Sequence, residues 1–348
     1  MEATSDVCAR VSHPRCSPPF SKNTEHSTIL YTDYKERVPM KSKLWLVFAI
    51  VTTLFWGVWG ALIDIPRQAG FPQTLGYCVW ALTMIPPALV ALKIIDWDLE
   101  YDPRSIVLGS SVGFLGAGGQ LILFEALRLG PAYIIFPLIS LSPVVTILLS
   151  LWLLRENTTV RGWVGIVLAL VAIFLLSYEE PAAGVVSGGY LWMGLALLVF
   201  LAWGIQAYVI KFANETMEAE SIFFYMMVTA LLLIPIALTM TDFSQEINWG
   251  LSGPYAAAGI QVLNAVGALC LVYAFRYGQA IIVSPLTNAV APVITVGISL
   301  TIYAVDPFDI PYKITGIVVA LTATFLMAIE EETEESVAKE LEAKEVIS

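Results

Sequence analysis

The chain has 348 residues, of which 57% are hydrophobic and 14% are charged, and its mean hydropathy is +0.76. Soluble globular proteins contain about 45–50% apolar and about 25% charged residues. The composition therefore excludes a water-soluble enzyme, a disordered chain and a nucleic-acid-binding protein. The formal net charge of −11 comes largely from an acidic run that begins at Glu330. We expect residues 330–348 to form a solvated cytoplasmic tail.

The first 43 residues are polar, rich in proline, serine and threonine, and without the apolar core of a signal peptide. Acidic residues among them argue against a transit peptide, so we expect residues 1–43 to form a disordered cytoplasmic extension. The four cysteines, Cys8, Cys16, Cys78 and Cys270, are interpreted as free thiols. Neither they nor the two histidines have metal-ligand spacing, so we expect no metal site and no cofactor.

Ten segments are long enough to cross about 30 Å of hydrocarbon as α-helices. Short connections, such as Gly130-Pro131 and Tyr277-Gly278-Gln279, require neighbouring helices to run antiparallel. The chain is therefore predicted to be an all-α integral membrane protein. The predicted spans are 44–63, 74–92, 105–127, 131–154, 160–178, 188–210, 221–240, 254–275, 280–304 and 312–329.

An even number of spans places both ends of the chain on the same side of the membrane. If that side is the cytoplasm, fifteen Lys and Arg residues lie inside, and only Arg67, Arg128 and Lys313 lie outside. Basic residues concentrate in cytoplasmic loops. We therefore expect both termini in the cytoplasm and the protein in the plasma (inner) membrane.

The most informative feature is an internal repeat. Residues 126–138 match residues 274–286 at seven of thirteen positions, and Trp56-Gly57 in the first span matches Trp203-Gly204 in the sixth. Because each repeat has an odd number of spans, the second enters the membrane in the opposite orientation. Inverted repeats of this kind are typical of secondary transporters. The chain is thus predicted to contain two inverted five-helix halves, at 44–180 and 188–329.

The same residues carry a resemblance to a known family. The first half contains Glu125-Ala126-Leu127-Arg128, Pro137-Leu138, Pro143-Val144, Arg155-Glu156, Gly162 and Gly165. This pattern resembles the EamA-type repeat of the drug/metabolite transporter superfamily, and the resemblance covers both halves. It implies ten helices around an enclosed central site, and export or exchange of small metabolites by alternating access. Two features depart from the family pattern: Asp306-Pro307 stands where Glu is favoured, and the second span lacks its usual basic residue.

Polar side chains inside a span are costly, and they usually face the interior of a bundle or water. Those near the middle of the predicted spans are mostly amides. Trp56 and Trp203 fit either the wall of a site or the aromatic belt at the membrane surface, and each amide fits either a ligand contact or a hydrogen bond between helices. We predict a substrate-binding site formed by Trp56, Gln120, Ser140, Trp203, Gln206, Asn264 and Asn288.

Two pairs of prolines occupy matching places in the fourth and ninth spans: Pro137 and Pro143, and Pro285 and Pro292. Each removes a backbone donor and interrupts the helical hydrogen-bond ladder near the middle of the membrane. We predict that they act as hinges, with static kinks as the alternative.

Coupling of transport to protons requires a carboxyl group that titrates inside the protein. Glu125 and Asp64 are the candidates for this role. Burial would favour the protonated form, whereas Arg128, three residues after Glu125, would favour the charged form. A structural ion pair is the alternative.

Other functional classes have less support. The predicted spans contain no histidine, so we expect no catalytic residues and no enzyme activity. A channel would need a ring of charges or a filter-like loop, and a membrane receptor or scaffold is the alternative to a carrier. We expect the lipid bilayer and a small-molecule substrate as partners and no nucleic acid, and a homodimer is left open.

Overall fold

The computed structural model describes residues 43–178, 190–302 and 311–328, and these ranges contain helices and no strands. Ten helical segments in them are long and apolar enough to cross a membrane. They agree with the predicted spans to within a few residues, which confirms the all-α membrane fold. The acidic tail, most of the N-terminal extension and Asp306-Pro307 lie outside the described residues.

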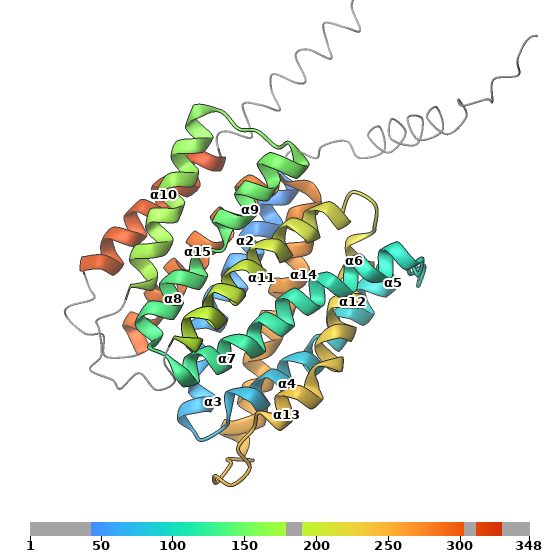
Figure 1. Cartoon of the computed structure of the whole chain (residues 1–348), viewed down its shortest axis with the longest axis vertical. Coiled ribbons are helices and arrows are strands. Elements are labelled where there is room, and N and C mark those ends of the chain that lie inside the picture. The colour runs from blue at the N-terminus through green and yellow to red at the C-terminus, as the bar shows by residue number, and fades with distance from the viewer. Residues whose placement is uncertain (1–42, 179–189, 303–310, 329–348) are drawn as a thin grey trace, which may run out of the picture. The chain divides into compact units, whose positions relative to one another are not determined.

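Spans one to five make up the first half (Figure 1). Several of them consist of two or more shorter helical pieces. The pieces are α2 Leu44–Leu62 and α3 Asp64–Gln68; α4 Gln73–Thr83 and α5 Ile85–Ile94; α6 Pro103–Gly113, the π-helical turn η1 Phe114–Gly118 and α7 Gly119–Leu129; α8 Ala132–Ser140, α9 Pro143–Leu149 and the π-helical turn η2 Ser150–Leu154; and α10 Val160–Ser177.

Spans six to ten make up the second half. They are α11 Leu191–Ala213; α12 Ala219–Leu232 and α13 Ile234–Thr239; the π-helical turn η3 Leu251–Tyr255 and α14 Ala256–Tyr277; α15 Ala280–Ile302; and a last helix at Pro311–Ala328.

Spans two and seven break at matching places, and proline explains both breaks. The second span breaks at Met84, just before Pro86-Pro87, and the seventh breaks at Leu233, just before Pro235. Proline lacks the backbone N–H that an interior helical position needs, but it fits the first turn of a new helix.

The fourth and ninth spans differ, although their prolines match in sequence. In the fourth span, α8 ends at Ser140 and α9 begins at Pro143. In the ninth, α15 continues through both Pro285 and Pro292. A break between helices at the matching prolines therefore occurs only in the fourth span.

A one-residue difference accounts for this break. Two residues separate Ser140 from Pro143, whereas three separate Asn288 from Pro292 and preserve the spacing of one helical turn. The shorter fourth span closes its turn with tighter bonds, of which the one from the N–H of Ser142 to the carbonyl of Ile139 is 3.0 Å long. Such three-residue bonds cannot continue an α-helix.

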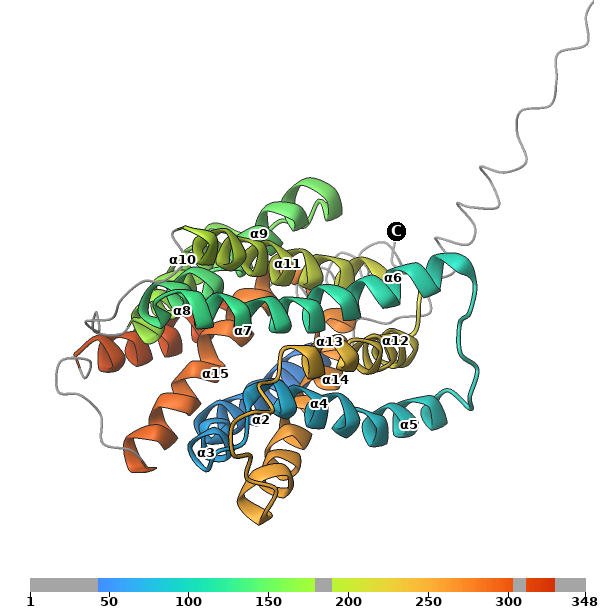
Figure 2. The same cartoon turned by 60° about the horizontal axis from the view of Figure 1, so that its bottom comes forward.

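The two halves pack crosswise (Figures 1 and 2). The first helix of the first half, α2, packs against α14 and α15 of the second half. The first helix of the second half, α11, packs against α6, α7, α8 and α9 of the first. Each half therefore depends on the other for the burial of its leading helix.

The ends of the spans form two faces of the bundle. We call one the Arg128 face, which carries the end of α7 and the connection from α2 to α4. The other is the Arg276 face, which carries the end of α14 and the connection from α11 to α12. Every charged residue in the described spans lies within about one turn of a span end. The middle of the bundle therefore contains no ionic group among the described residues.

Candidate transport site

The first crossing lies where α2 meets α14 and α15. The indole Nε1 of Trp56 donates to the carbonyl of Asn264 at 3.3 Å, and Thr295 Oγ1 donates to the carbonyl of Gly57 at 2.9 Å. A Cβ on Gly57 would lie 2.6 Å from Cγ2 of Ile294, closer than real carbon atoms approach. Only glycine lets the two helices come this near.

The second crossing repeats these contacts where α11 meets η1, α7 and α9. The indole Nε1 of Trp203 donates to the carbonyl of Gly116 at 3.3 Å, and Thr146 Oγ1 donates to the carbonyl of Gly204 at 3.0 Å. A Cβ on Gly204 would lie 2.6 Å from the carbonyl oxygen of Ser142 and would overlap with Val145.

The two crossings thus share their Trp, Gly and Thr contacts, although the helices run in opposite directions. The first crossing also has a bond from Thr52 Oγ1 to the carbonyl of Gly267 at 3.2 Å. The match extends to a second pair of glycines, since a Cβ on Gly267 would lie 2.6 Å from Nε1 of Trp56, and one on Gly119 would lie 2.6 Å from Nε1 of Trp203. Trp56 and Trp203 therefore wall the interface between the halves, which favours the interior interpretation over the surface belt.

Amide side chains gather beside these crossings. Gln206 lies against Gly116, where its side chain occupies the space that a Cβ would need. Trp59 Nε1 donates to Gln261 Oε1 at 3.0 Å, and Gln261 is buried. The predicted site omitted this last pair. Gln261 is one of the amides near the middle of the predicted spans and lies three residues from Asn264 on one face of the helix, but the predicted site did not include it.

The remaining predicted binding residues are less clearly placed at the interface. Asn264 contributes its backbone carbonyl to the first crossing, and its side chain is half-buried. Asn288 donates to the carbonyl of Ser284 in its own helix at 2.9 Å. Gln120 and Ser140 are half-buried. A substrate contact for these residues stays a prediction.

The two candidate coupling carboxylates form ion pairs within single helices. Asp64 accepts from Nε of Arg67 at 2.7 Å, and Glu125 accepts from Nη2 of Arg128 at 2.5 Å. The exposed fractions of the two carboxyl side chains are 45% and 36%. The proposed role in coupling stays a prediction, and the structural ion pair that was its alternative is present at both positions.

The prolines lie close to the crossings. Pro143 precedes Thr146 by three residues, and Pro292 precedes Thr295 by the same distance. Pro137 is buried inside α8. A bend at either proline would move the threonine that bonds the opposite half, and the hinge role stays a prediction.

One sequence pattern invites a catalytic interpretation that the structure does not support. Residues 109–113 have the spacing G-x-S-x-G, which in hydrolases marks a strained turn between a strand and a helix. Here the segment is the end of α6, and Ser111 Oγ donates to the carbonyl of Val107 one turn earlier. Gly109 and Gly113 instead receive Tyr225 and Thr229 of α12, so this segment packs helices together.

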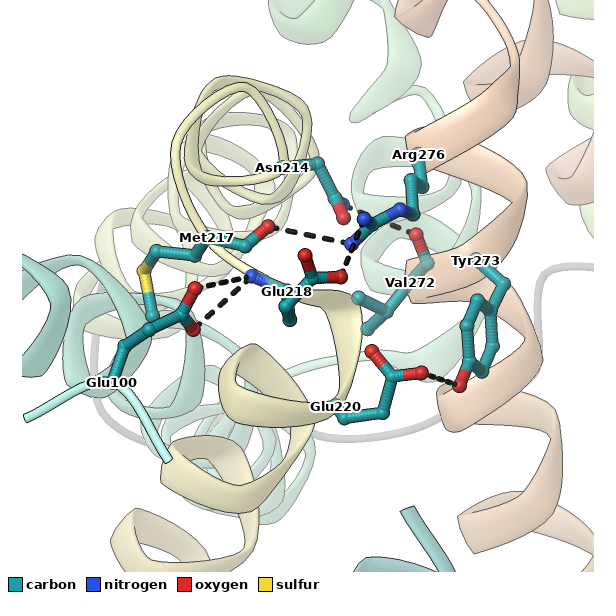
Figure 3. Close-up of polar contacts among 8 residues, drawn as sticks. All are labelled: Glu100, Asn214, Met217, Glu218, Glu220, Val272, Tyr273 and Arg276. Atoms are coloured by element: carbon teal, nitrogen blue, oxygen red, sulfur yellow. Dashed lines mark hydrogen bonds and ion pairs between the residues drawn. The ribbon is translucent and has the colours of Figure 1, made fainter. Parts of the chain in front are cut away.

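A polar cluster occupies the Arg276 face (Figure 3). Arg276, at the end of α14, pairs with Glu218 at 2.5 Å and donates to the carbonyl of Met217 at 3.4 Å. One turn earlier, the hydroxyl of Tyr273 donates to the carboxylate of Glu220, which is only 6% exposed. The end of α14 is thus joined to the start of α12.

Other contacts reinforce this face. Asn214 Nδ2 donates to the carbonyl of Val272 at 3.1 Å, and Lys211 Nζ donates to the carbonyl of Gly278 at 2.7 Å. The carboxylate of Glu100 accepts from the N–H of Glu218 at 3.0 and 3.1 Å (Figure 3). This cluster was not predicted, because Glu218 and Glu220 lie just outside the predicted seventh span and Glu100 lies between the predicted second and third spans.

A further acidic residue caps a helix at the same face. Glu156, which follows the fourth span, accepts from the backbone N–H groups of Ala280 and Ile281 at 3.0 and 2.9 Å. These groups begin α15, where a negative charge is stabilised by the helix dipole. Glu156 belongs to the motif that carries the family resemblance, and the structure assigns it this capping contact.

Within the described ranges, no three His, Cys, Asp or Glu side chains come together in a way that could hold a metal ion. The polar groups of the crossings are amides, hydroxyls, indoles and backbone carbonyls. Such groups recognise a ligand by hydrogen bonding and shape.

Comparison with known proteins decides the family. The model of the EamA-like transporter family matches residues 43–178 and 190–329, one match in each half. The chain belongs to the EamA-like transporter family. It is therefore a multi-pass membrane transporter of the drug/metabolite superfamily, and the two matches fit the inverted-repeat arrangement.

Two relatives are similar in sequence. Protein LicB of Haemophilus influenzae is 24% identical over 299 residues, which cover 81% of this chain and 94% of LicB. The uncharacterized protein MJ1333.1 of Methanocaldococcus jannaschii is 44% identical over 62 residues, or 18% of this chain. That second match spans 45% of the archaeal protein's length.

One solved crystal structure of a protein has a TM-score of 0.66 to this chain at 16% identity. The similarity covers 82% of this chain and 98% of the other. At this identity the likeness concerns the fold alone.

Proposed function

We propose that this EamA-family protein carries a small solute across the plasma membrane by alternating access, as an exporter or an exchanger. The observation that supports this most directly is the crosswise docking of α2 and α11. The same Trp, Gly and Thr contacts join the halves at two places that are inverted with respect to the membrane. If the two halves exchange conformations, access changes from one side to the other.

The solute is proposed to bind between the two crossings. The proposal is supported by Gln206, which lies against Gly116 at the second crossing, and by Asn264, whose carbonyl accepts from Trp56 at the first. Because the described spans carry their charges only near their ends, the site offers hydrogen bonds and aromatic surface. An isolated charge in such a place would lose its hydration without an ionic partner. The proposed substrate is therefore a solute without net charge.

The Arg276 face is proposed to lie at the cytoplasm. The proposal is supported by the excess of Lys and Arg residues on the side that carries both chain ends. A cysteine at position 40, in a protein without its native cysteines, should resist impermeant thiol reagents added outside intact cells. Labelling from outside would contradict this orientation.

Flux in proteoliposomes tests the proposed function. The full chain, reconstituted alone, should exchange an uncharged metabolite loaded inside the vesicles for the labelled compound outside. A panel of neutral amino acids, sugars and other neutral metabolites supplies the candidates. Absence of exchange over protein-free vesicles for every compound would contradict a carrier and favour a receptor or scaffold.

Substitutions test the location of the site. Gln206→Ala and Asn264→Ala should each weaken the apparent affinity by up to about tenfold, because a hydrogen bond contributes about 0.5–1.5 kcal/mol. Gln245→Ala, at an exposed position between α13 and η3, is the matched control. Unchanged affinity in both site variants would contradict this location.

A further inference from the structure

The pseudo-symmetry of the chain allows its two faces to be compared group by group. Residues 126–138 align with 274–286, so Arg276 at the end of α14 corresponds to Arg128 at the end of α7. Tyr273 likewise corresponds to Glu125. The connection from α11 to α12 corresponds to the connection from α2 to α4, since each follows the leading helix of its half.

At the Arg276 face these elements are joined. Arg276 reaches from α14 to Glu218 and Met217, and Tyr273 reaches to Glu220 (Figure 3). Asn214 adds a bond to α14. The helices themselves also pack there, because α11 contacts α14.

At the Arg128 face the corresponding groups are not joined to each other. Within the described part of the chain, Arg128 and Glu125 bond to one another on α7, and Asp64 and Arg67 bond to one another on α3. Side-chain exposure follows the same difference, at 67% for Arg128 and 14% for Arg276. The ends of α7 and α14 are thus bonded differently at the two faces. The Arg128 face has a different link, in which Asn248, between α13 and η3, donates from Nδ2 to the carbonyl of Ala69 at 2.8 Å.

We propose that the contacts of Arg276 and Tyr273 with residues 217–220 form a closed gate, and that the structure is the state with access from the Arg128 face. This gate rests on the proposed function, since a gate controls the path of a carrier. In the opposite state, the Arg276 contacts break. The exposed pairs at the other face then exchange partners, so that Arg128 meets Asp64 and Arg67 meets Glu125.

The charges make this exchange chemically consistent. Each of the two ion pairs at the Arg128 face contains one acidic and one basic residue, three residues apart. If the pairs exchange partners, two ion pairs still form, but each then joins α3 to α7 instead of lying within one helix. Surface ion pairs contribute little energy on their own, which lets them change partners at small cost. The ion pair between Arg276 and Glu218 is stronger than the pairs at the Arg128 face, because Arg276 is largely buried and the interaction is less screened by water.

Thiol labelling of a buried gate position tests the proposal without requiring a known solute. Met217→Cys places a reporter at a side chain that is 3% exposed, in a full chain whose Cys8, Cys16, Cys78 and Cys270 are replaced. The protein is held in lipid nanodiscs, so an impermeant maleimide reaches both faces. Removing the ion pair with Arg276→Gln should raise the labelling rate about tenfold, corresponding to about 1.4 kcal/mol.

Two matched variants exclude general loosening. Arg128→Gln removes the corresponding arginine at the other face, and the labelling rate should stay at the parent value. Glu218→Gln removes the same ion pair from its more exposed partner and should raise the rate as Arg276→Gln does. The exchanged pair Glu218→Arg with Arg276→Glu should return the rate toward the parent value.

The proposal is overturned if neither Arg276→Gln nor Glu218→Gln accelerates labelling, or if Arg128→Gln accelerates it equally. The gate and the carrier function are tested separately. Accelerated labelling together with absent flux for every solute would support the gate and contradict the proposed function, whereas flux with unchanged labelling would do the reverse.

Discussion

At the Arg276 face, side chains from α14 reach a neighbouring connection, whereas at the Arg128 face the corresponding side chains bond within their own helices. Between the faces, the two crossings share one Trp, one Thr and two close-packed glycines each, and the first adds bonds from Thr52 to Gly267 and from Trp59 to Gln261. The contacts that occur in both copies thus lie in the middle of the bundle, and the contacts of Arg276 and Arg128 at its ends are not matched.

This difference separates two kinds of contact. A contact that appears twice in inverted copies is compatible with both states of an exchanging structure, and it is expected to hold the halves together throughout. The contacts of Arg276 at the end of the bundle, which appear once, are the ones proposed to belong to one state. If this distinction holds, matched substitutions at the two crossings have similar effects, and matched substitutions at the two faces do not.

The largest expected effect comes from filling a crossing. Gly57→Ala and Gly204→Ala each place a Cβ where a helix of the other half already lies, and overpacking costs about 1–3 kcal/mol. Both variants should lower the thermal unfolding midpoint in detergent by similar amounts. Gly259→Ala, where no atom lies within 4 Å of the new Cβ, is the control and should be neutral or stabilising. A large effect at only one crossing would contradict their equivalence.

Removing the cap of α15 should have the next largest effect. Glu156→Gln loses the charge that two backbone N–H groups share, and helix capping and dipole interactions of this kind contribute about 1–2 kcal/mol. The unfolding midpoint should fall, and amide exchange at Ala280 and Ile281 should accelerate. Glu246→Gln, at an exposed loop position, should change neither; equal effects of the two substitutions would argue against the cap.

The two threonines offer a finer comparison of the crossings. Thr146→Val and Thr295→Val keep the side-chain shape and remove one bond to a glycine carbonyl, so each should cost about 1 kcal/mol. Thr146 Oγ1 also accepts from Ser284 Oγ at 3.3 Å. Thr146→Val should therefore lower the free energy of unfolding slightly more than Thr295→Val does. Chemical denaturation of the two variants measures the difference. A larger loss at Thr295 would contradict this ranking.

The smallest expected effect is a pH dependence at the start of α6. Hydrogen bonds from the side chain and backbone of Ser105 hold the pKa of the Asp102 carboxyl below its usual value. A lowered pKa in the folded state means that the stabilisation is present above the ordinary value and is lost as pH falls through the lowered one. Amide exchange at Arg104 and Ser105 should accelerate over that range. Asp102→Asn should flatten the profile; an unchanged profile would contradict this source.

The architecture was accessible from the sequence because its signals extend over many residues. The sequence contains ten apolar segments and a repeated Trp-Gly pair at 56–57 and 203–204. These patterns can be recognised even when the predicted span boundaries are wrong by a few residues. The repeat also implied the inversion. What sequence alignment cannot reveal is that α2 packs in the other half, because an alignment pairs equivalent residues rather than touching ones.

The site was less predictable, for two physical reasons. An amide such as Gln261 can face a neighbouring helix or the proposed solute pathway, depending on how its helix is rotated about its axis. A pattern of isolated polar residues does not determine that rotation. The state of each face depends on side chains that are near in space but far along the chain, such as Arg276 and Glu218. The break in the fourth span depends on a single residue, since one residue fewer separates Ser140 from Pro143 than separates Asn288 from Pro292 in the ninth span.

The central claim is that the two faces alternate, and distances across both faces test it most directly. Spin labels at Glu215 and Gln279 report on the Arg276 face, and labels at Gln68 and Leu129 report on the other and leave Arg128 in place, in separate full-length samples in nanodiscs. Pulsed dipolar spectroscopy is recorded for the parent background and for Arg276→Gln. We predict that the variant lengthens the first distance and shortens the second. If both distances lengthen together, or if only the Arg276 face changes, the two faces do not alternate and the account is wrong.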